Sequence, residues 1–371
     1  MKRTVVLTST ENFVWSSMQE IIPMIEMAWK LAAGPRHRVR IVDVGQEKIS
    51  DYLADVVQAD QVVFTCFTAK LARLGEFLRR SANVDGRWIV YLHNQATIGC
   101  WPLFAWGMGE QLRSDDVFIS SSTRDARTLK LTFPEGDVRV HPFPLPLPLI
   151  EMTKVKSTKR TSPTFVYSGR LSSQKNVHTL IYAFSLYVNR NGPAKLVLFG
   201  GEDGLGSPNM GFKDEGYESY LRRLVSTLGI EDRVEFAGAL PRAELHERLR
   251  TPHVLVSASL HSDENFGMSA LRSLCMGAPC VLSAWGGHWD FAKDFSSQLQ
   301  LVAVHGSDWG PWIDAGEFAN AMAKALRNSS SAKTRASRVP VRYRVGSMAK
   351  LLQKLTREPR VTRRKPLAAS K

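Results

Sequence analysis

Residues 164–176 read TFVYSGRLSSQKN, and this stretch decides the fold class. The apolar and β-branched run Thr164 to Tyr167 predicts a short strand, and the helical pattern of Asn176 to Val188 follows it after a tight turn. Ligands of parallel sheets bind beyond the carboxyl ends of the strands, where such turns lie. Arg170 and Lys175 therefore become the first candidate site residues, since together they could neutralise a diphosphate.

The same unit of strand, turn and helix repeats on both sides of this stretch, which indicates parallel sheets wrapped by helices. We predict an α/β fold of two tandem Rossmann-like domains with a cleft between them. The strands predicted for the first domain are Thr4–Leu7, Val39–Val44, Gln61–Cys66, Trp88–Leu92 and Val117–Ser120. Those of the second are Thr164–Tyr167, Lys195–Phe199, Val234–Phe236, Val254–Ser257, Pro279–Ser283 and Gln300–Val304.

The length of 371 residues suits two domains of roughly 150 residues each, and a composition of 44% hydrophobic and 23% charged residues argues against wholesale disorder. Alternating prolines followed by a basic run rich in Ser and Thr mark a linker between them. The predicted parts are a first domain over 1–150, the linker over 151–163, a second domain over 164–335, a helix over 336–356 and a mobile basic tail over 357–371.

The positive charge of the chain is concentrated at its end. The net charge is 49 − 35 = +14, and residues 333–371 hold thirteen Lys and Arg against the single acid Glu358, so the other 332 residues carry only +2. Such a tail can be attracted to an anionic membrane surface, or it can simply be solvated. Nucleic acid ranks lower as a partner, because Tyr343 is the only aromatic residue interleaved with these cations.

The chain is predicted to be cytoplasmic, at most peripheral to a membrane. No uncharged apolar run reaches the ~18 residues of a membrane span, and the apolar run after Lys2 and Arg3 is too short for a secretory signal. The four cysteines contain no CxxC pair, which fits buried thiols in a reducing compartment.

Several classes of enzyme lack their motifs here. A GxGxxG fingerprint and a Walker sequence are both missing, and His246-Glu247 has no second histidine at the spacing of a zinc protease. No aspartates stand at DxD spacing, so the usual carboxylate grip on a metal-bound nucleotide diphosphate has no candidate. We therefore expect chemistry without a metal and without a resident cofactor.

A second candidate site lies in residues 262–268, SDENFGM, which lead from a loop into a helical pattern. Gly267 would let backbone N–H groups of the helix start approach a phosphate, and Glu264 could accept hydrogen bonds from sugar hydroxyls. Alternatively, Glu264 could merely complement the helix N-terminus electrostatically.

Taken together, these residues resemble glycosyltransferase family 4, which has the GT-B fold. The resemblance rests on six ordered motifs between about Thr164 and Gly287. They are SGRL with QKN, LFGG, LGI-x-DRV-x-F-x-G, ENFGM, GAPCV and the pair Gly286-Gly287.

The resemblance implies retaining, metal-independent transfer of a hexose from a nucleotide-diphosphate sugar to a glycan, lipid-linked or small-molecule acceptor. Arg170 and Lys175 match the family's donor-phosphate cations, and Glu264 matches the first acid of its two-glutamate motif. The departing phosphate would take the acceptor's proton on the same face. The other residues that match the family's donor site are Gly169, Gly200, Gly201, Asn265, Phe266, Gly267 and Met268.

The second acid of that motif is absent, because Arg272 stands eight residues after Glu264. The usual carboxylate contact with the nucleotide ribose therefore cannot form. Either donor binding is rewired, for example with Arg272 reaching a phosphate or an acid, or the chain is a non-catalytic protein of the same fold that binds a nucleotide sugar or a partner.

In the first domain, His93 follows the predicted strand Trp88–Leu92, where the family often has a histidine near the reacting sugar. We take His93 as a catalytic candidate, against the alternative of a structural histidine. The resemblance also implies that the C-terminal helix returns to the first domain and brings the basic end beside the acceptor side.

Overall fold

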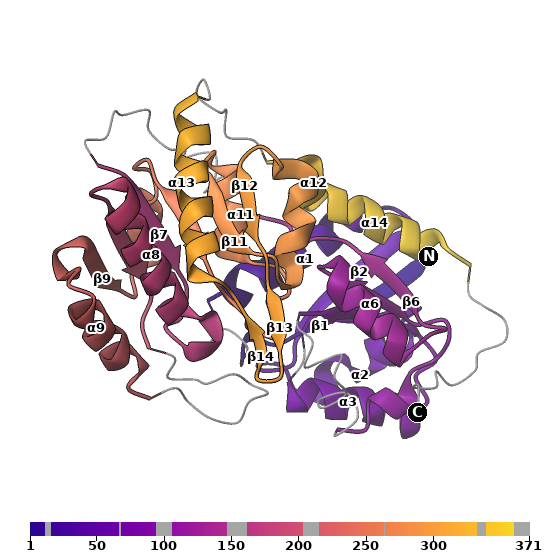
Figure 1. The fold of residues 1–371 in the computed structure, drawn as a ribbon. Helices are drawn as coiled ribbons and strands as arrows, with labels where there is room; N and C mark the ends of the chain where they lie inside the picture. Colours follow the sequence, from indigo (N-terminus) through magenta and orange to yellow (C-terminus); the bar gives the residue numbers. More distant parts are fainter. Residues whose placement is uncertain are drawn as a thin grey trace. The chain divides into compact units, whose positions relative to one another are not determined.

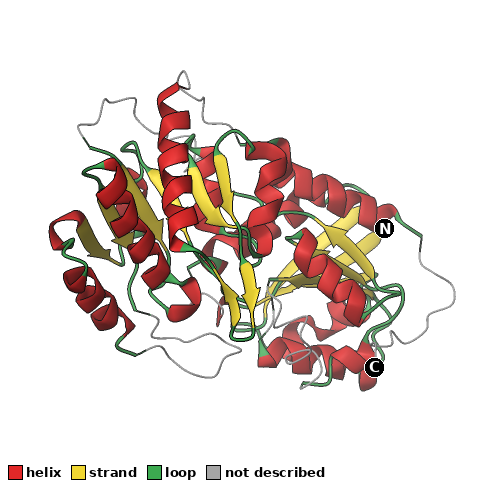
Figure 2. Cartoon of the chain, viewed as in Figure 1, coloured by secondary structure: helices red, strands yellow, loops and turns green. Residues whose placement is uncertain are grey.

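The computed structural model describes residues 1–11, 16–66, 68–93, 106–146, 162–202, 215–262, 264–331 and 339–359. The chain divides into unit 1, Met1–Pro146 with Val341–Lys371, and unit 2, Leu147–Pro340. Each unit is built around one parallel sheet, as Figure 1 shows along the chain and Figure 2 by type of element. Most of the predicted linker lies outside the described residues.

The sheet of unit 1 has the strand order β2-β1-β3-β4-β5-β6, and every neighbouring pair is parallel. Its central strands β3 and β4 are buried along their whole length, as expected of a parallel sheet covered on both faces. The strands are β1 (Lys2–Thr8), β2 (His37–Asp43), β3 (Gln61–Phe64), β4 (Arg87–Leu92), β5 (Val117–Ser120) and β6 (Asp137–Val140). The helices are α1 (Met18–Ala32), α2 (Ile49–Val57), α3 (Ala69–Arg80), α6 (Thr123–Thr132) and α14 (Val345–Arg357).

The prediction of five strands for this domain was wrong, because β6 is a sixth. Its sequence DVRV alternates charged and apolar residues, and all four are exposed or only half-buried at the sheet edge. A run of only four half-exposed residues, followed directly by a proline-rich segment, gives little sign of a strand in the sequence.

The sheet of unit 2 has the order β12-β11-β10-β7-β8-β9, again with parallel pairs. Counted from β7, this is the Rossmann order 3-2-1-4-5-6. The strands are β7 (Thr164–Ser168), β8 (Lys195–Phe199), β9 (Val234–Gly238), β10 (Val254–Ser257), β11 (Cys280–Ser283) and β12 (Leu299–Val302). The α-helices are α8 (Val177–Asn191), α9 (Tyr217–Thr227), α10 (Arg242–Arg248), α11 (Met268–Cys275), α12 (Ala292–Phe295) and α13 (Ala315–Ser331). A hairpin that we did not predict, β13 (His305–Ser307) with β14 (Gly310–Trp312), precedes α13.

Helix α14 closes unit 1. Met348, Leu352 and Leu355 are buried, and the helix lies beside α1. Their spacing of i, i+4 and i+7 puts one apolar stripe against the domain, as the sequence pattern predicts for a packed helix.

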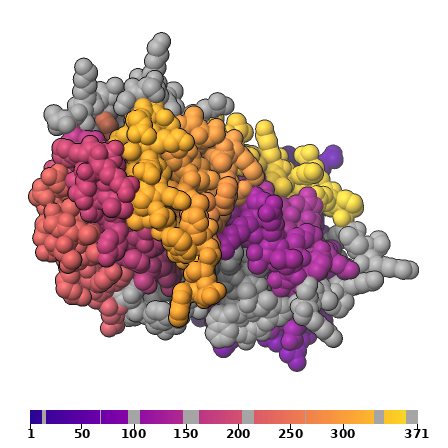
Figure 3. Space-filling model, in the orientation of Figure 1, coloured from indigo at the N-terminus to yellow at the C-terminus, as the bar shows by residue number. Residues whose placement is uncertain are grey.

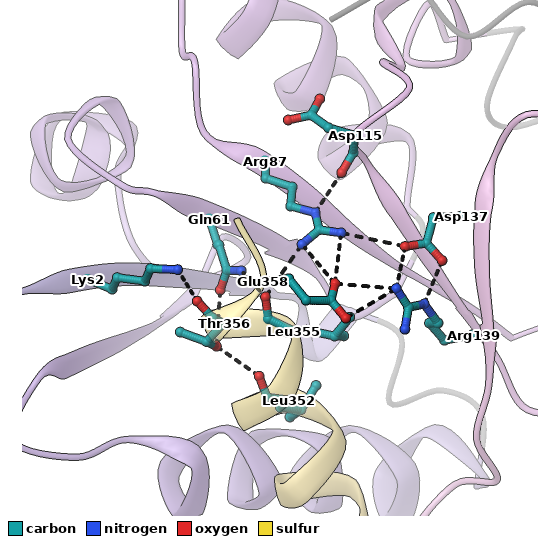
Figure 4. A network of polar contacts seen from close by, with 10 residues as sticks. All are labelled: Lys2, Gln61, Arg87, Asp115, Asp137, Arg139, Leu352, Leu355, Thr356 and Glu358. Carbon is teal, nitrogen blue, oxygen red and sulfur yellow. Dashed lines mark hydrogen bonds and ion pairs between the residues drawn. The ribbon is translucent and has the colours of Figure 1, made fainter. Parts of the chain in front are cut away.

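The last turn of α14 meets the amino-terminal edge of the sheet (Figure 4). The carbonyl of Leu355 accepts hydrogen bonds of 3.4 Å from Gln61 and Arg87, and the carbonyl of Thr356 accepts one from Lys2. These donors are the first residues of β3, β4 and β1. They satisfy carbonyl groups that a helix C-terminus leaves without intrahelical partners, and two of them bring positive charge to the negative end of the helix dipole.

Glu358 extends this contact beyond the helix. Its carboxylate lies 3.4 Å from Arg87 and 3.3 Å from Arg139, and Asp137 bridges the same two arginines at 3.6 and 2.5 Å. Arg357 is thus the last helical residue and Glu358 is held by ion pairs, while residues 360–371 lie outside the described residues.

This attachment shows where α14 ends relative to the strands of unit 1. His93, our acceptor-side candidate, directly follows the carboxyl end of β4, whereas α14 ends at the amino end of the same strand. The end of α14 therefore lies at the edge of the sheet opposite His93. In the described part of the chain, every helix is too short or too polar to cross a membrane.

Candidate active site

The candidate site of unit 2 lies where its sheet reverses direction. From β7 the chain moves to β8 on one side, whereas β10 lies on the other side of β7 and leads outward to β11. The loops that follow β7 and β10 both start at the carboxyl edge of the sheet, from neighbouring strands. Open α/β sheets bind their ligands at such a switch point.

The loop after β7 carries the predicted cations and is tightly constrained. The hydroxyl of Tyr167 donates a 2.6 Å hydrogen bond to the carbonyl of Arg170, whose side chain is half-buried. A Cβ atom on Gly200, which has φ +133°, would lie 1.8 Å from the carbonyl oxygen of Gly169. Only glycine at position 200 lets the loop after β8 approach the loop after β7 this closely. The N–H of Leu171 also bonds the carbonyl of Gly201 at 2.8 Å.

The structure brings Lys175 and Glu264 together. Nζ of Lys175 donates a hydrogen bond of 2.6 Å to Oε2 of Glu264, and their side chains are only 18% and 11% exposed. The N–H of Leu260 bonds the carbonyl of Gln174 at 3.1 Å, which fastens the loop after β10 to the loop after β7. Residues 89 positions apart thus form one charged pair at the switch point.

Glu264 is held in its ionised form. Burial opposes ionisation, but the ammonium of Lys175 and hydrogen bonds from Lys175 and Ser259 outweigh it and hold the pKa of Glu264 well below its usual range. The carboxylate is therefore charged at neutral pH, and its Oε1 lies on the side of His288, 3.9 Å from Nε2 of that ring.

The ring of His288 packs beside this carboxylate. Burial lowers the pKa of His288 in spite of the carboxylate nearby, so its ring is neutral at neutral pH. Nδ1 lies 3.1 Å from the carbonyl of Ser283, which makes Nδ1 the protonated nitrogen and fixes the tautomer. The ring also fills the space beside Gly267, where an added Cβ would lie 3.0 Å from it.

The glycine pair before His288 is pressed against the same loop. A Cβ atom on Gly286 would lie 1.9 Å from the carbonyl oxygen of Glu264, and one on Gly287 would lie 2.0 Å from that of Asn265. The N–H of Gly287 bonds the carbonyl of Glu264 at 2.8 Å. A side chain at position 286 or 287 would collide with this backbone, so both glycines are needed for the close approach to Glu264.

The segment from Asn265 to Met268 leads into α11. Phe266 is buried with its ring edge toward Phe291, and Gly267 precedes the helix in the left-handed region, with φ +76°. Met268 is the first helical residue, so the N–H groups of the first turn of α11 face the loop as the sequence predicts. Arg272 is buried in the last turn of this helix.

His93 belongs to unit 1. Its Nε2 contacts the carbonyl of Thr65 and its ring stacks on Phe143 with 4.9 Å between the ring centres. Burial lowers the pKa of His93 to about 4. The ring is therefore neutral, with its proton on Nε2 and Nδ1 as the acceptor.

Sequence reasoning missed three residues of the site. Ser259 donates a hydrogen bond to Glu264, the hydroxyl of Ser283 donates a 2.6 Å hydrogen bond to the carbonyl of Ser259, and the ring of His288 packs beside the carboxylate. A signal was present for His288, because it directly follows the pair Gly286-Gly287 that the resemblance singled out.

Comparisons with known proteins match the chain to a family model and to several relatives. The family model "Glycosyl transferases group 1" matches residues 150–338, which include both loops of the site. The mannosylfructose-phosphate synthase of Agrobacterium fabrum is 32% identical over 119 residues, which are 32% of this chain and 25% of that relative. The match thus spans only about a quarter of the relative's length.

Solved structures resemble the chain over nearly its whole length. Sucrose-phosphate synthase from Thermosynechococcus elongatus superposes with a TM-score of 0.62 at 16% identity, covering 96% of this chain and 94% of that one. Anabaena HepE, solved in complex with UDP and glucose, also has a TM-score of 0.62 at 16% identity, covering 95% and 99%. At such identities these likenesses show the fold, and they confirm the predicted GT-B fold class.

Proposed function

This chain belongs to the family Glycosyl transferases group 1, and we propose that it transfers a sugar from a nucleotide-diphosphate donor to an acceptor hydroxyl. Membership confirms the family 4 resemblance found in the sequence. The observation that carries the proposal is the pair Lys175–Glu264, a 2.6 Å contact at the switch point of the unit 2 sheet. Anabaena HepE, which shares the fold, was solved with UDP and glucose.

Donor phosphates would be held on the Lys175 side of the site. An ammonium has three N–H donors, so Lys175 can keep its bond to Glu264 while it donates to a phosphate oxygen. Arg170, from the same loop, adds a second fixed positive charge, and the first turn of α11 behind Gly267 adds backbone N–H groups. These groups would stabilise the growing charge on the leaving diphosphate without reorganising.

Glu264 would bind the donor sugar. An ionised carboxylate accepts hydrogen bonds only, which suits sugar hydroxyls and opposes phosphate oxygens. Hydrogen bonds from Lys175 and Ser259 hold its orientation, so the carboxylate is positioned before the sugar arrives. We expect a hexose here, with retention of the anomeric configuration, as in the family resemblance.

The reaction would need no metal. This expectation rests on the sequence, which has no DxD pair, and on the cations Arg170 and Lys175, which offer the positive charge that a metal would otherwise bring. On the acceptor side, His93 is the candidate, because it directly follows the carboxyl end of β4 and its ring is neutral. The acceptor would be a glycan, a lipid-linked sugar or a small molecule.

Arg272 favours a second candidate, a non-catalytic protein that binds a nucleotide sugar or a partner. It occupies the place of the family's second acid and is buried in α11. The two candidates are distinguished by incubating the chain with a panel of nucleotide sugars and sugar acceptors and measuring release of the nucleotide diphosphate. Release that depends on acceptor and is lost in Glu264→Ala supports transfer, whereas donor binding with no release supports the non-catalytic protein.

A peripheral association with membranes is part of the proposal. Residues 360–371 contain five Lys and Arg and no acid, and such clusters are drawn to anionic lipids. Nucleic acid remains the weaker alternative. These residues lie outside the described part of the chain, so the proposal for them rests on the sequence.

A further inference from the structure

Helices α1 and α14 lie side by side in unit 1 and expose one continuous surface. We define the α1–α14 face by six exposed residues, Met27, Lys30 and Leu31 of α1 with Lys350, Lys354 and Arg357 of α14. Figure 1 shows both helices, and in Figure 3 α14 appears in yellow at the molecular surface.

The spacing along α14 and one hydrogen bond show that these side chains form a single surface. Lys350, Lys354 and Arg357 follow one another at i, i+4 and i+7, so they project from the same side of the helix. Gln353 lies among them, and its Nε2 donates a 3.4 Å hydrogen bond to the carbonyl of Leu31. The end of α1 therefore lies directly beside this cationic stripe.

The charge of the face is not neutralised by the residues described around it. Among these residues, no ion pair of 4.0 Å or less involves Lys30, Lys350, Lys354 or Arg357. The acid one turn before Lys30 on α1 is Glu26, which is half-buried and hydrogen-bonded to Thr8; burial raises its pKa and the charge of Lys30 opposes this rise, so Glu26 offsets Lys30 only in part. Glu358 at the end of α14 is engaged with Arg87 and Arg139.

The face also exposes apolar side chains. Met27 is 44% exposed and Leu31 is 51% exposed, and they stand one turn apart on α1. A single exposed apolar side chain is ordinary on a protein surface. Here two of them share one face with four cations. Cations beside exposed apolar side chains are the pattern of segments that lie in the interface of a membrane.

We propose that the α1–α14 face docks on the surface of an anionic phospholipid bilayer. The cations would contact lipid phosphates, while Met27 and Leu31 would enter the headgroup region. A nucleic acid would satisfy the cations but would leave both apolar side chains in water, so lipid is the better match. The face is separate from the donor-binding loops, which belong to unit 2, and the proposal does not depend on sugar transfer.

The face would act together with the basic end of the chain. Arg357 is the last residue of α14, and the sequence continues into the five cations of 360–371. Folded face and tail can be separated experimentally, because a chain that ends after Pro359 keeps the whole of α14 and Glu358.

The test is flotation of the purified chain with vesicles of phosphatidylcholine alone or mixed with phosphatidylglycerol. A cation near an anionic surface contributes about fivefold to the partition coefficient, so Lys350→Gln/Lys354→Gln should lower it roughly 25-fold. Binding should require phosphatidylglycerol and weaken with added salt. Arg223→Gln/Lys324→Gln, which removes two exposed cations of unit 2, is the matched control and should leave binding nearly unchanged.

Two further variants separate the parts of the proposal. Leu31→Ser should weaken binding to mixed vesicles by a similar factor at low and at high salt, because it removes the apolar contribution, which salt does not screen. The chain that ends after Pro359 should keep a residual binding that Lys350→Gln/Lys354→Gln abolishes. Equal losses in the control pair and in the α14 pair would overturn the proposal, as would vesicle binding that depends only on the tail. Tighter binding to a short DNA duplex, unaffected by Leu31→Ser, would favour nucleic acid and would also overturn it.

Discussion

Nζ of Lys175 lies 2.6 Å from Oε2 of Glu264, so a cation from the loop after β7 and an anion from the loop after β10 neutralise each other at one sheet edge. Because both side chains are largely buried, each lowers the cost of burying the other. Loss of either side chain would leave a largely buried charge without its partner and would remove one link between the two loops. Variants of either residue should change both stability and activity.

Replacing either loop cation should slow sugar transfer strongly. If Arg170 and Lys175 each stabilise the charge of the leaving group, Arg170→Ala and Lys175→Ala should each lower kcat by ~10² or more. The measurement is release of nucleotide diphosphate in the presence of acceptor. Arg223→Ala, at an exposed position of α9, is a suitable control. Rates like those of the unmodified chain in both loop variants would remove the two cations from the mechanism.

Glu264→Ala should impair sugar transfer more than binding of the free nucleotide diphosphate. The carboxylate is assigned to the sugar, and anionic phosphates gain nothing from it. Calorimetric titration with the nucleotide diphosphate and with the intact nucleotide sugar would compare the two affinities. An equal loss of affinity for both ligands would contradict this assignment.

Glu264 should also make the fold sensitive to strong acid. Its pKa in the folded chain lies well below the unfolded value of about 4.3, so the unfolded chain binds more protons as the pH falls below that value. The stabilisation is complete above about pH 4.3 and is lost as the pH falls toward the folded pKa. Glu264→Gln should therefore be less stable than the unmodified chain at neutral pH, and denaturant titrations should find this difference shrinking below about pH 4.

His93 should affect the stability of the fold in a higher pH range than Glu264 does. Its folded pKa of about 4 lies below the unfolded value of about 6.5, so the unfolded chain binds more protons between these values and stability falls as the pH drops from 6.5 to 4. The loss is at most about 3 kcal/mol. His93→Gln should flatten the stability profile in that range, and an unchanged slope would show that His93 does not titrate there.

The end of α14 predicts where the chain can be shortened. A chain that ends after Pro359 keeps Glu358 and should melt like the full chain, whereas one that ends after Thr356 loses it and leaves Arg87 and Arg139 without that partner. Glu358→Gln should cost about 1 kcal/mol, since its side chain is 23% exposed and the ion pairs are partly screened. Calorimetric melting compares the three variants. Equal melting of both shortened chains would contradict the role of Glu358.

Much of the fold could be predicted because buried parallel strands leave a strong pattern. The run VVF of β3 and the run WIVYL of β4 are apolar throughout, and both were found within two residues of their observed ends. Edge strand β6 and the hairpin β13–β14 were missed, since their half-exposed residues carry little hydrophobic pattern.

The candidate site could be predicted only in part. Lys175 and Glu264 stood out because each follows a strand end within a recognisable motif. Their mutual bond, the hydrogen bond from Ser259 and the packing of His288 depend on three loops that meet only in the folded sheet. Arg272 shows the same limit, because its place in the sequence marks it as unusual without indicating which groups it contacts.

The return of α14 to unit 1 has a consequence for synthesis on the ribosome. Unit 1 contains residues from both ends of the chain, so it cannot be completed until the last helix has been made. During translation of 147–340, the surface of α1 that later packs against α14 is exposed, as are the arginines that later hold Glu358. Unit 2 is continuous in sequence, so it can fold before the last helix of unit 1 has been made.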